Sequence, residues 1–219
     1  MIQLNQLHYR YPNSDFHLEI GSLKIEKGKK TAVIGPSGFG KTTLLNLVAG
    51  IITPAEGTVQ VNDIAVNALP EKQRRDYRIK EIGFVFQDFK LLEYLNVLDN
   101  ILLPFRINSV MNIDQQIKDA ARHIAASLNI EDKLPRYPSR LSHGERQRVA
   151  ICRALLNKPP VILADEPTGN LDPDNKHHIM KILFNYVDSY GATLVTVTHD
   201  HELLSGFDSV IDFQKLRIK

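Results

Sequence analysis

The chain has 219 residues, 43% of them apolar, which suits one compact domain or a domain with a subdomain. A net charge of +2 excludes the broad basic surface of many nucleic-acid-binding proteins, and a single cysteine, Cys152, excludes an internal disulfide framework. Because no apolar run approaches the roughly 20 residues of a membrane-spanning helix and no signal peptide is recognisable, we expect a cytoplasmic protein that reaches a membrane only through a partner.

The first part of the chain predicts short strands. Residues 2–11 and 16–20 alternate apolar and polar side chains, and residues 58–61 are β-prone and followed by a turn. These strands are expected to form an antiparallel sheet that flanks a nucleotide-binding strand.

The stretch from Gly35 to Thr42 reads G-x-x-x-x-G-K-T, the phosphate-binding loop pattern. An apolar strand at 31–34 and a helix at 42–50 are expected on either side, which is the context the pattern needs. Glycines let backbone N–H groups point at phosphate oxygens, Lys41 is expected to reach the β- and γ-phosphates, and the Thr42 hydroxyl is expected to bind Mg²⁺. The expected nucleotide contacts here are Gly35, Pro36, Ser37, Gly38, Phe39, Gly40, Lys41, Thr42 and Thr43.

A basic helix and an apolar strand follow. Residues 70–79 predict a helix rich in lysine and arginine, which would form either a basic groove or a solvated face; the modest net charge favours the solvated face. Residues 82–86 predict a strand that ends at Gln87.

The middle of the chain predicts helices at 96–103, 112–128 and about 142–156. In the second, one apolar stripe is formed by Ile113, Ile117, Ala120, Ala121, Ile124 and Leu128. We therefore expect residues 88–156 to be a helical insertion between strands.

Two nearly continuous apolar strands return at 161–164 and 192–198, with a helix at about 174–188 between them and a last strand near 208–213. This β–α–β spacing predicts a parallel sheet covered on both faces.

The strand at 161–164 ends in two carboxylates, Asp165 and Glu166. Beside a phosphate loop, we expect Asp165 to hold Mg²⁺ through water from a strand neighbouring that of the loop, and Glu166 to orient and deprotonate the attacking water. The alternative is an ordinary acidic pair at a turn before Pro167, and the phosphate loop argues against it.

Residues 141–145 read Leu-Ser-His-Gly-Glu before a helix. Ser142 and Glu145 form an S-x-x-E capping box that would start this helix, and the same N-terminus can bind an anion. The stretch resembles the signature motif of the ATP-binding cassette (ABC) ATPases, and the resemblance covers essentially the whole chain.

The resemblance implies further roles. Gln87 matches the glutamine that contacts metal and water, Asp172 in Gly169-Asn170-Leu171-Asp172 matches the acidic D-loop residue, and His199 matches the switch histidine that contacts the γ-phosphate. Tyr11 matches the aromatic residue that stacks on adenine, with Tyr9 as a rival. The expected sets are Glu166, His199, Gln87 and Lys41 for catalysis; Thr42, Gln87 and Asp165 for the metal; and Tyr11, Ser142, Gly144, Glu145 and Asp172 as nucleotide contacts beyond the loop.

For the fold, the resemblance implies the α/β class: a P-loop NTPase (RecA-like) core with a parallel sheet, an antiparallel β subdomain and a helical ABC subdomain. One ABC ATPase domain would span 1–219, with 1–87 and 157–219 as the nucleotide-binding core with its β subdomain and 88–156 as the helical subdomain with the signature motif. It also implies a homodimer packed head to tail, with ATP and Mg²⁺ between the phosphate loop of one copy and Ser142 and Gly144 of the other.

Residues 84–92, 96–104 and 164–172 resemble the branch of this family that holds LolD, MacB and FtsE. That branch implies an ATP-hydrolysing subunit that drives a separate integral membrane subunit of the lipoprotein-release or drug and peptide export type. It would bind peripherally at the inner face of the cell membrane, without nucleic acid. The alternatives are an FtsE-like regulatory ATPase of a cell-division complex and a soluble non-transport ABC ATPase.

The sequence leaves two questions undecided, the role of His143 and the role of residues 88–104. His143 stands where the signature motif usually has glycine, and we expect it at the rim of the active site. Residues 88–104 would either dock the membrane subunit or form the core of the helical subdomain; the apolar residues concerned are Phe89, Leu91, Leu92, Tyr94 and Leu95.

Overall fold

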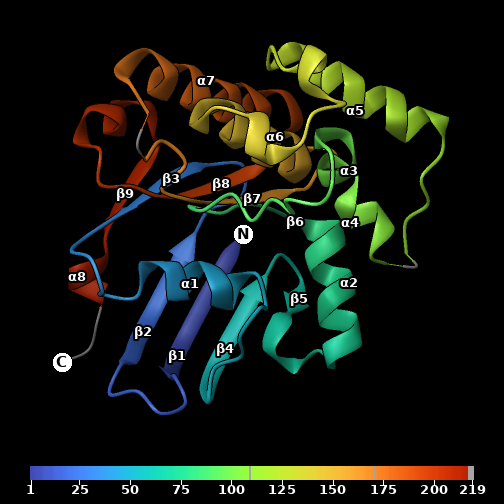
Figure 1. Cartoon of the computed structure of the whole chain (residues 1–219). Coiled ribbons are helices and arrows are strands. Elements are labelled where there is room, and N and C mark those ends of the chain that lie inside the picture. Colours follow the sequence, from blue (N-terminus) through green and yellow to red (C-terminus); the bar gives the residue numbers. More distant parts are fainter. Residues whose placement is uncertain (109, 170, 217–219) are drawn as a thin grey trace.

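The computed structural model describes residues 1–108, 110–169 and 171–216, and its strands form two sheets (Figure 1). One sheet is entirely parallel, in the order β6 (Ile82–Val85), β7 (Val161–Asp165), β8 (Thr193–Val197), β3 (Lys30–Ile34) and β9 (Ser209–Asp212). The other is antiparallel, in the order β2 (His17–Ile25), β1 (Ile2–Arg10), β4 (Glu56–Val61) and β5 (Ile64–Ala65). The expected combination of a parallel and an antiparallel sheet is confirmed.

The helices lie close to where the sequence places them, although the helix expected at 96–103 is broken at Leu102, before Pro104. The α-helices are α1 (Lys41–Val48), α2 (Glu71–Glu81), α3 (Val97–Ile101), α4 (Leu103–Arg106), α5 (Gln115–Ser127), α6 (His143–Leu155), α7 (Pro173–Tyr190) and α8 (Phe213–Leu216). Short 3-10 helices span Val66–Ala68, Glu131–Lys133, Pro138–Arg140 and His201–Gly206. Over the described residues, no helix combines the length and the apolar character needed to cross a bilayer.

Apolar side chains cover both faces of the parallel sheet. In β7, Ile162 and Ala164 join a cluster with α3, α5, α6 and α7, whereas Val161 and Leu163 join a cluster with α1 and the antiparallel sheet. Figure 1 shows α1 between the two sheets and α6 and α7 on the opposite side of the parallel sheet. The alternation explains why these strands read as continuous apolar runs, since each face has its own core.

The strand order corrects one expectation. β8 lies between β3 and β7, so the strand that ends in Asp165 is not a direct neighbour of the strand that precedes the phosphate loop. Spacing along the chain predicts parallel strands but leaves their lateral order undetermined. All strands of this sheet still run the same way, so their carboxyl ends share one edge, which is where ligands bind in such sheets.

The helices of residues 88–156 do not have a separate core in the structure. The stripe predicted on α5 faces inward, with Ala121 and Leu128 buried, and it shares one apolar cluster with α7 and β8. The division into 1–87 with 157–219 and 88–156 follows the ends of β6 and α6, and it stays a prediction.

A buried amide holds the loop between β6 and α3. Asn100 is 0% exposed, and its side-chain NH₂ lies 3.0, 3.0 and 3.1 Å from the carbonyl oxygens of Leu92, Leu95 and Asn96. Its side-chain oxygen accepts from the Leu92 N–H at 2.8 Å. One side chain therefore satisfies the backbone of a loop that has no ladder partner.

We expect Asn100→Ala to lower the free energy of unfolding by about 2–3 kcal/mol, because the Leu92 N–H and the Leu95 carbonyl lose the partner that the buried Asn100 amide provides. Urea unfolding measures it. The control is Asp114→Ala, which removes an exposed cap from α5 (a bond to the Ile117 N–H at 2.8 Å) and should cost about 1 kcal/mol. Equal losses in the two variants would contradict the role given to Asn100.

Candidate active site

The junctions that follow β3, β6, β7 and β8 meet at one cavity of about 530 Å³. It is lined by Tyr11, Phe16, Ser37, Gly38, Gly40, Lys41, Thr42, Thr43, Gln87, Glu166, Val197 and His199. The structure thus brings together the phosphate loop, Tyr11, Gln87, Glu166 and His199, as the sequence predicts. The sequence did not predict Phe16, which also lines the cavity and whose ring centroid lies 5.7 Å from that of Tyr11. A phenylalanine at the start of a strand carries no sequence signal for a binding site.

The phosphate loop presents a positive charge at a helix start that no side chain caps. Lys41 is 5% exposed, and its ammonium donates to the carbonyl oxygens of Gly35 at 2.7 Å and Pro36 at 2.8 Å. Burial lowers the pKa of Lys41, and the carboxylates of Glu166 and Asp165 oppose that shift. No side chain caps the start of α1, where Gly40 has φ 100° and a Cβ would lie 2.8 Å from the Phe16 ring. The loop therefore fits a phosphate chain, which can take up the helix donors.

Asp165 and Thr42 offer oxygen ligands for a hard cation. Asp165 is 4% exposed; burial raises its pKa, and a hydrogen bond with the Thr42 side chain opposes the shift. A carboxylate and a hydroxyl suit Mg²⁺, which usually takes its remaining ligands from water and substrate phosphates. The described residues hold no group of three or more His, Cys, Asp or Glu side chains that could bind a metal ion.

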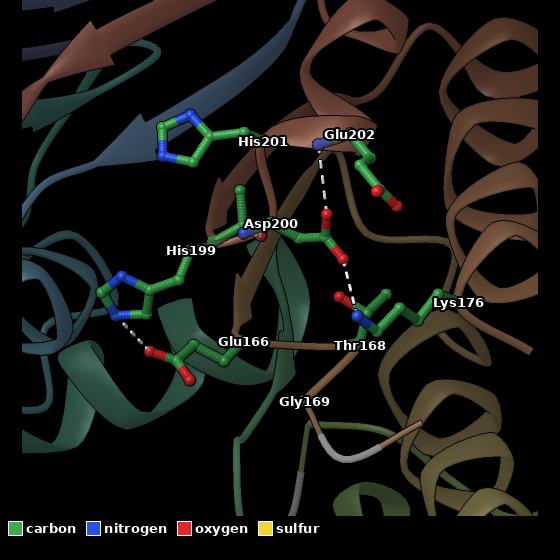
Figure 2. Close-up of a pocket in the computed structure, with 9 residues that line it drawn as sticks. Glu166, Thr168, Gly169, Lys176, His199, Asp200, His201 and Glu202 are labelled. Atoms are coloured by element: carbon green, nitrogen blue, oxygen red, sulfur yellow. Dashed lines mark hydrogen bonds and ion pairs between the residues drawn. The ribbon is translucent and has the colours of Figure 1, made fainter. Parts of the chain in front are cut away.

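Glu166 lies between Gln87 and His199. The His199 Nε2 atom is 2.9 Å from Glu166 Oε1, and the Gln87 amide donates to Glu166 Oε2 at 3.4 Å. Figure 2 shows the carboxylate turned toward the His199 ring. Glu166 has φ 46°, a left-handed conformation that costs a residue of this kind about 1–3 kcal/mol and is found mainly at functional sites.

A second cavity of about 420 Å³ shares Glu166 and His199 with the first, and Figure 2 shows the residues that line it. Lys176 of α7 forms an ion pair at 2.8 Å with Asp200, which in turn accepts from the Glu202 N–H at 3.1 Å. The Lys176 hydrogen bond lowers the pKa of Asp200. These contacts, which the sequence did not reveal, fix the loop that carries His199.

The two candidate tyrosines lie in different environments. Tyr11 lines the cavity, and its hydroxyl is 3.3 Å from Thr43 Oγ1. Tyr9 is 9% exposed inside the β subdomain core and contacts Tyr11 edge-on at 4.9 Å. Of the two, only Tyr11 lines the cavity, which agrees with the prediction that it stacks on the base, and Tyr9 packs against its ring.

Four other expected residues, Ser142, Gly144, Glu145 and Asp172, line a separate cavity of about 280 Å³ together with His143, Arg148, Leu171 and Asn175. The expected residues Gly35, Pro36, Phe39 and Asp165 line neither cavity. The capping box is present: Ser142 Oγ accepts from the Glu145 N–H at 3.2 Å, and the Glu145 carboxylate accepts from the Ser142 N–H at 2.7 Å and has a lowered pKa chiefly for that reason. Asp172 likewise caps α7 through the Asn175 N–H at 3.1 Å. Asn170 lies outside the described residues. One copy of the chain thus holds two half-sites.

His143 is exposed, but its ring is not free. It contacts the Phe89 ring edge-on, with centroids 4.7 Å apart and planes at 73°. Phe89 itself is 8% exposed, so this part of the segment 88–104 faces inward.

Comparison with known proteins decides the family. Residues 18–169, more than half of the chain, match the family model described as ABC transporter. The chain belongs to the ABC transporter family. A LolD protein of the lipoprotein-releasing system of Treponema denticola is 41% identical over 187 residues, covering 85% of this chain and 82% of the relative. A macrolide export protein MacB of Rhodopirellula baltica is 39% identical over 214 residues, covering 96% of this chain and 31% of the relative.

The fold agrees with that assignment. A solved dimeric ATP-binding cassette, MJ0796, in a post-hydrolysis state bound to ADP and Pi, matches with a TM-score of 0.88 and 33% identity, covering 97% of this chain and 95% of that one. The chain is thus an ABC ATPase cassette, and the relatives with this fold hydrolyse ATP and form dimers. Two half-sites in one chain are what a dimeric cassette needs.

We expect Tyr11→Ala to weaken ATP binding by about 1–3 kcal/mol, the usual worth of one base–aromatic stack. Tyr9→Leu should keep ATP affinity because it leaves the cavity lining intact and preserves apolar volume. Lys41→Ala should abolish tight binding, since it removes the charge-assisted contact to phosphate. Titration with a fluorescent ATP analogue measures all three. A larger loss in Tyr9→Leu than in Tyr11→Ala would overturn the assignment of the stacking residue.

Proposed function

We propose that this cassette is an ATP-hydrolysing subunit that acts as a head-to-tail homodimer on a separate membrane subunit, of the kind that serves lipoprotein release or drug and peptide export. The observation that carries the proposal is the division of the nucleotide contacts into two cavities, one with the phosphate loop and one with Ser142 and Gly144. Each cavity holds only part of the expected nucleotide contacts. A second copy, turned head to tail, supplies the missing half.

In this proposal ATP is bound by both backbone and side-chain groups of the first cavity. The N–H groups of the loop and of α1 face the phosphates, Lys41 adds its charge, and Tyr11 stacks on the adenine. Thr42 and Asp165 would hold Mg²⁺, with Gln87 beside them; this ion supplies charge neutralisation on the phosphates.

Hydrolysis in this proposal depends on Glu166. Its carboxylate accepts a proton from water as the water oxygen bonds to the γ-phosphorus and the bond to the ADP oxygen breaks. His199, at 2.9 Å, and Gln87, at 3.4 Å, hold the carboxylate from two sides. The buried surroundings of Lys41 and Asp165 keep these charges from being screened by solvent.

The proposed membrane partner is inferred from the relatives, two of which are named for lipoprotein release and macrolide export. The segment 88–104, the candidate docking region, is divided in the structure. Phe89 is buried and Leu91 packs against the helical core, whereas Tyr94 is 75% exposed. We therefore place the docking surface around Tyr94 and exclude Phe89 from it.

We expect Glu166→Gln to bind ATP, to hydrolyse it about 10²–10⁴-fold more slowly, and to dimerise when ATP is present, because the amide keeps the volume but cannot take the proton. Glu202→Gln, in the adjoining cavity, is the matched control and should keep the wild-type rate. ATPase assays and sedimentation with and without ATP test both. A variant that is saturated with ATP and still monomeric would contradict the shared site.

We expect Tyr94→Glu to abolish co-purification of the membrane subunit from detergent-solubilised membranes while the protein keeps its fold and basal ATPase rate. A charge placed in an apolar contact must be desolvated on binding. Tyr190→Glu, at an exposed tyrosine at the end of α7, is the control and should retain the partner. Retention of the subunit by Tyr94→Glu would place the docking surface elsewhere, and identification of the captured subunit tests the transport type.

A further inference from the structure

The turn that follows Gln87 has an unfavourable backbone. Phe89 and Lys90 have φ angles of 62° and 48°, in the left-handed region that residues with a Cβ rarely adopt. Within the turn, the Phe89 N–H donates to the Phe86 carbonyl at 3.0 Å and the Lys90 N–H to that of Asp88 at 2.6 Å. Two such residues in succession persist only where other contacts fix them.

Arg153 of α6 supplies those contacts. It is 9% exposed, and its guanidinium donates to the Lys90 carbonyl at 2.7 Å and to the Phe89 carbonyl. Burial lowers the pKa of Arg153 to about 10, so the group stays charged at neutral pH. A planar guanidinium can bind two acceptors at once, and charge-assisted bonds are the strong ones.

Two further side chains tie the same segment to the helices. The His143 ring at the start of α6 packs against Phe89, and Asn100 of α3 holds residues 92–96. We call residues 89–96 the strap. The strap is fixed to α3 and α6, whereas Gln87, just before it, contacts Glu166 at the end of β7.

We propose that Arg153 is a positioning residue for ATP hydrolysis: by fixing the backbone of Phe89 and Lys90, it sets the Gln87 amide against the Glu166 carboxylate. The inference rests on the proposed roles of Gln87 and Glu166. Ser142 caps the start of α6 and lines the 280 Å³ cavity, and we assign it to the nucleotide bound by the partner copy. Arg153 thus links the position of the signature helix to the amide in its own copy's site.

The test is a double-mutant cycle on the full chain. Arg153→Lys keeps the charge but replaces the fork that binds two carbonyls with a single ammonium. We expect kcat to fall about tenfold, with the KM for ATP changed by less than about twofold, because the bound substrate is unaffected and only the amide is misplaced. In a Gln87→Ala background the same substitution should change kcat by less than about twofold, since the residue through which it acts is absent.

Arg78→Lys is the matched control. The Arg78 guanidinium also donates to a backbone carbonyl, that of Gly50 at 2.6 Å, and burial also lowers its pKa, but the loop it holds does not lead to Gln87. The Arg78→Lys variant should therefore keep kcat within about twofold of the wild-type value. Wild-type protein without ATPase activity would contradict the proposed function. An active wild type in which Arg153→Lys leaves kcat unchanged, or lowers it equally in both backgrounds, would overturn only the positioning role.

Hydrogen exchange gives a readout that needs no activity. Peptides that cover residues 86–92 should exchange faster in Arg153→Lys and at the wild-type rate in Arg78→Lys. Unchanged exchange in Arg153→Lys would overturn the proposal. If Arg153→Lys does not fold, His143→Gly removes the ring contact to the same turn, and its smaller loss of kcat should also vanish in the Gln87→Ala background.

Discussion

The parallel sheet, buried on both faces, is the constraint on which the rest of the structure depends. Because every strand of this sheet runs the same way, the groups that follow β3, β6, β7 and β8 reach one edge. Those groups are the phosphate loop, Gln87, the pair Asp165 and Glu166, and His199. The apolar clusters on the two faces hold the strands in place. The positions of the catalytic groups at the edge are therefore set by the packing of side chains that take no part in catalysis.

The sequence predicted those parts of the site that depend on local order along the chain. The phosphate loop and the capping box each lie within a few residues, and the structure places both at the predicted positions. The acidic pair ends its predicted strand, but that strand is not the direct neighbour of the strand before the loop. What it did not predict depends on long-range packing. β8 separates β3 from β7, and Arg153 holds two carbonyls more than sixty residues away. Backbone acceptors leave no signature in the sequence, because every residue has one.

Backbone strain occurs on both sides of one contact. Glu166, with φ 46°, and Phe89 and Lys90, with φ 62° and 48°, flank the hydrogen bond between the Gln87 amide and the Glu166 carboxylate. Left-handed residues of this kind persist only where their surroundings over-determine them. Glu166 is held by its N–H bond to the Val197 carbonyl at 3.0 Å, and the strap is held by Arg153 and Asn100. Each side of the contact is therefore held by hydrogen bonds to elements outside it.

The signature half-site is prepared for an anion although its helix is already capped. Ser142 Oγ accepts from the Glu145 N–H, which leaves the hydroxyl proton free to be donated. The Glu145 carboxylate, which would repel a phosphate, is drawn back to the Ser142 N–H and lies 3.6 Å from the Lys133 ammonium. In the proposed dimer, a γ-phosphate presented by a second copy would accept a hydrogen bond from the Ser142 hydroxyl and be favoured by the dipole of α6 without breaking the cap. ADP lacks that phosphate, so in the proposed dimer the loss of the γ-phosphate would weaken the contact between copies without breaking the cap of α6, as a ligand-driven switch requires.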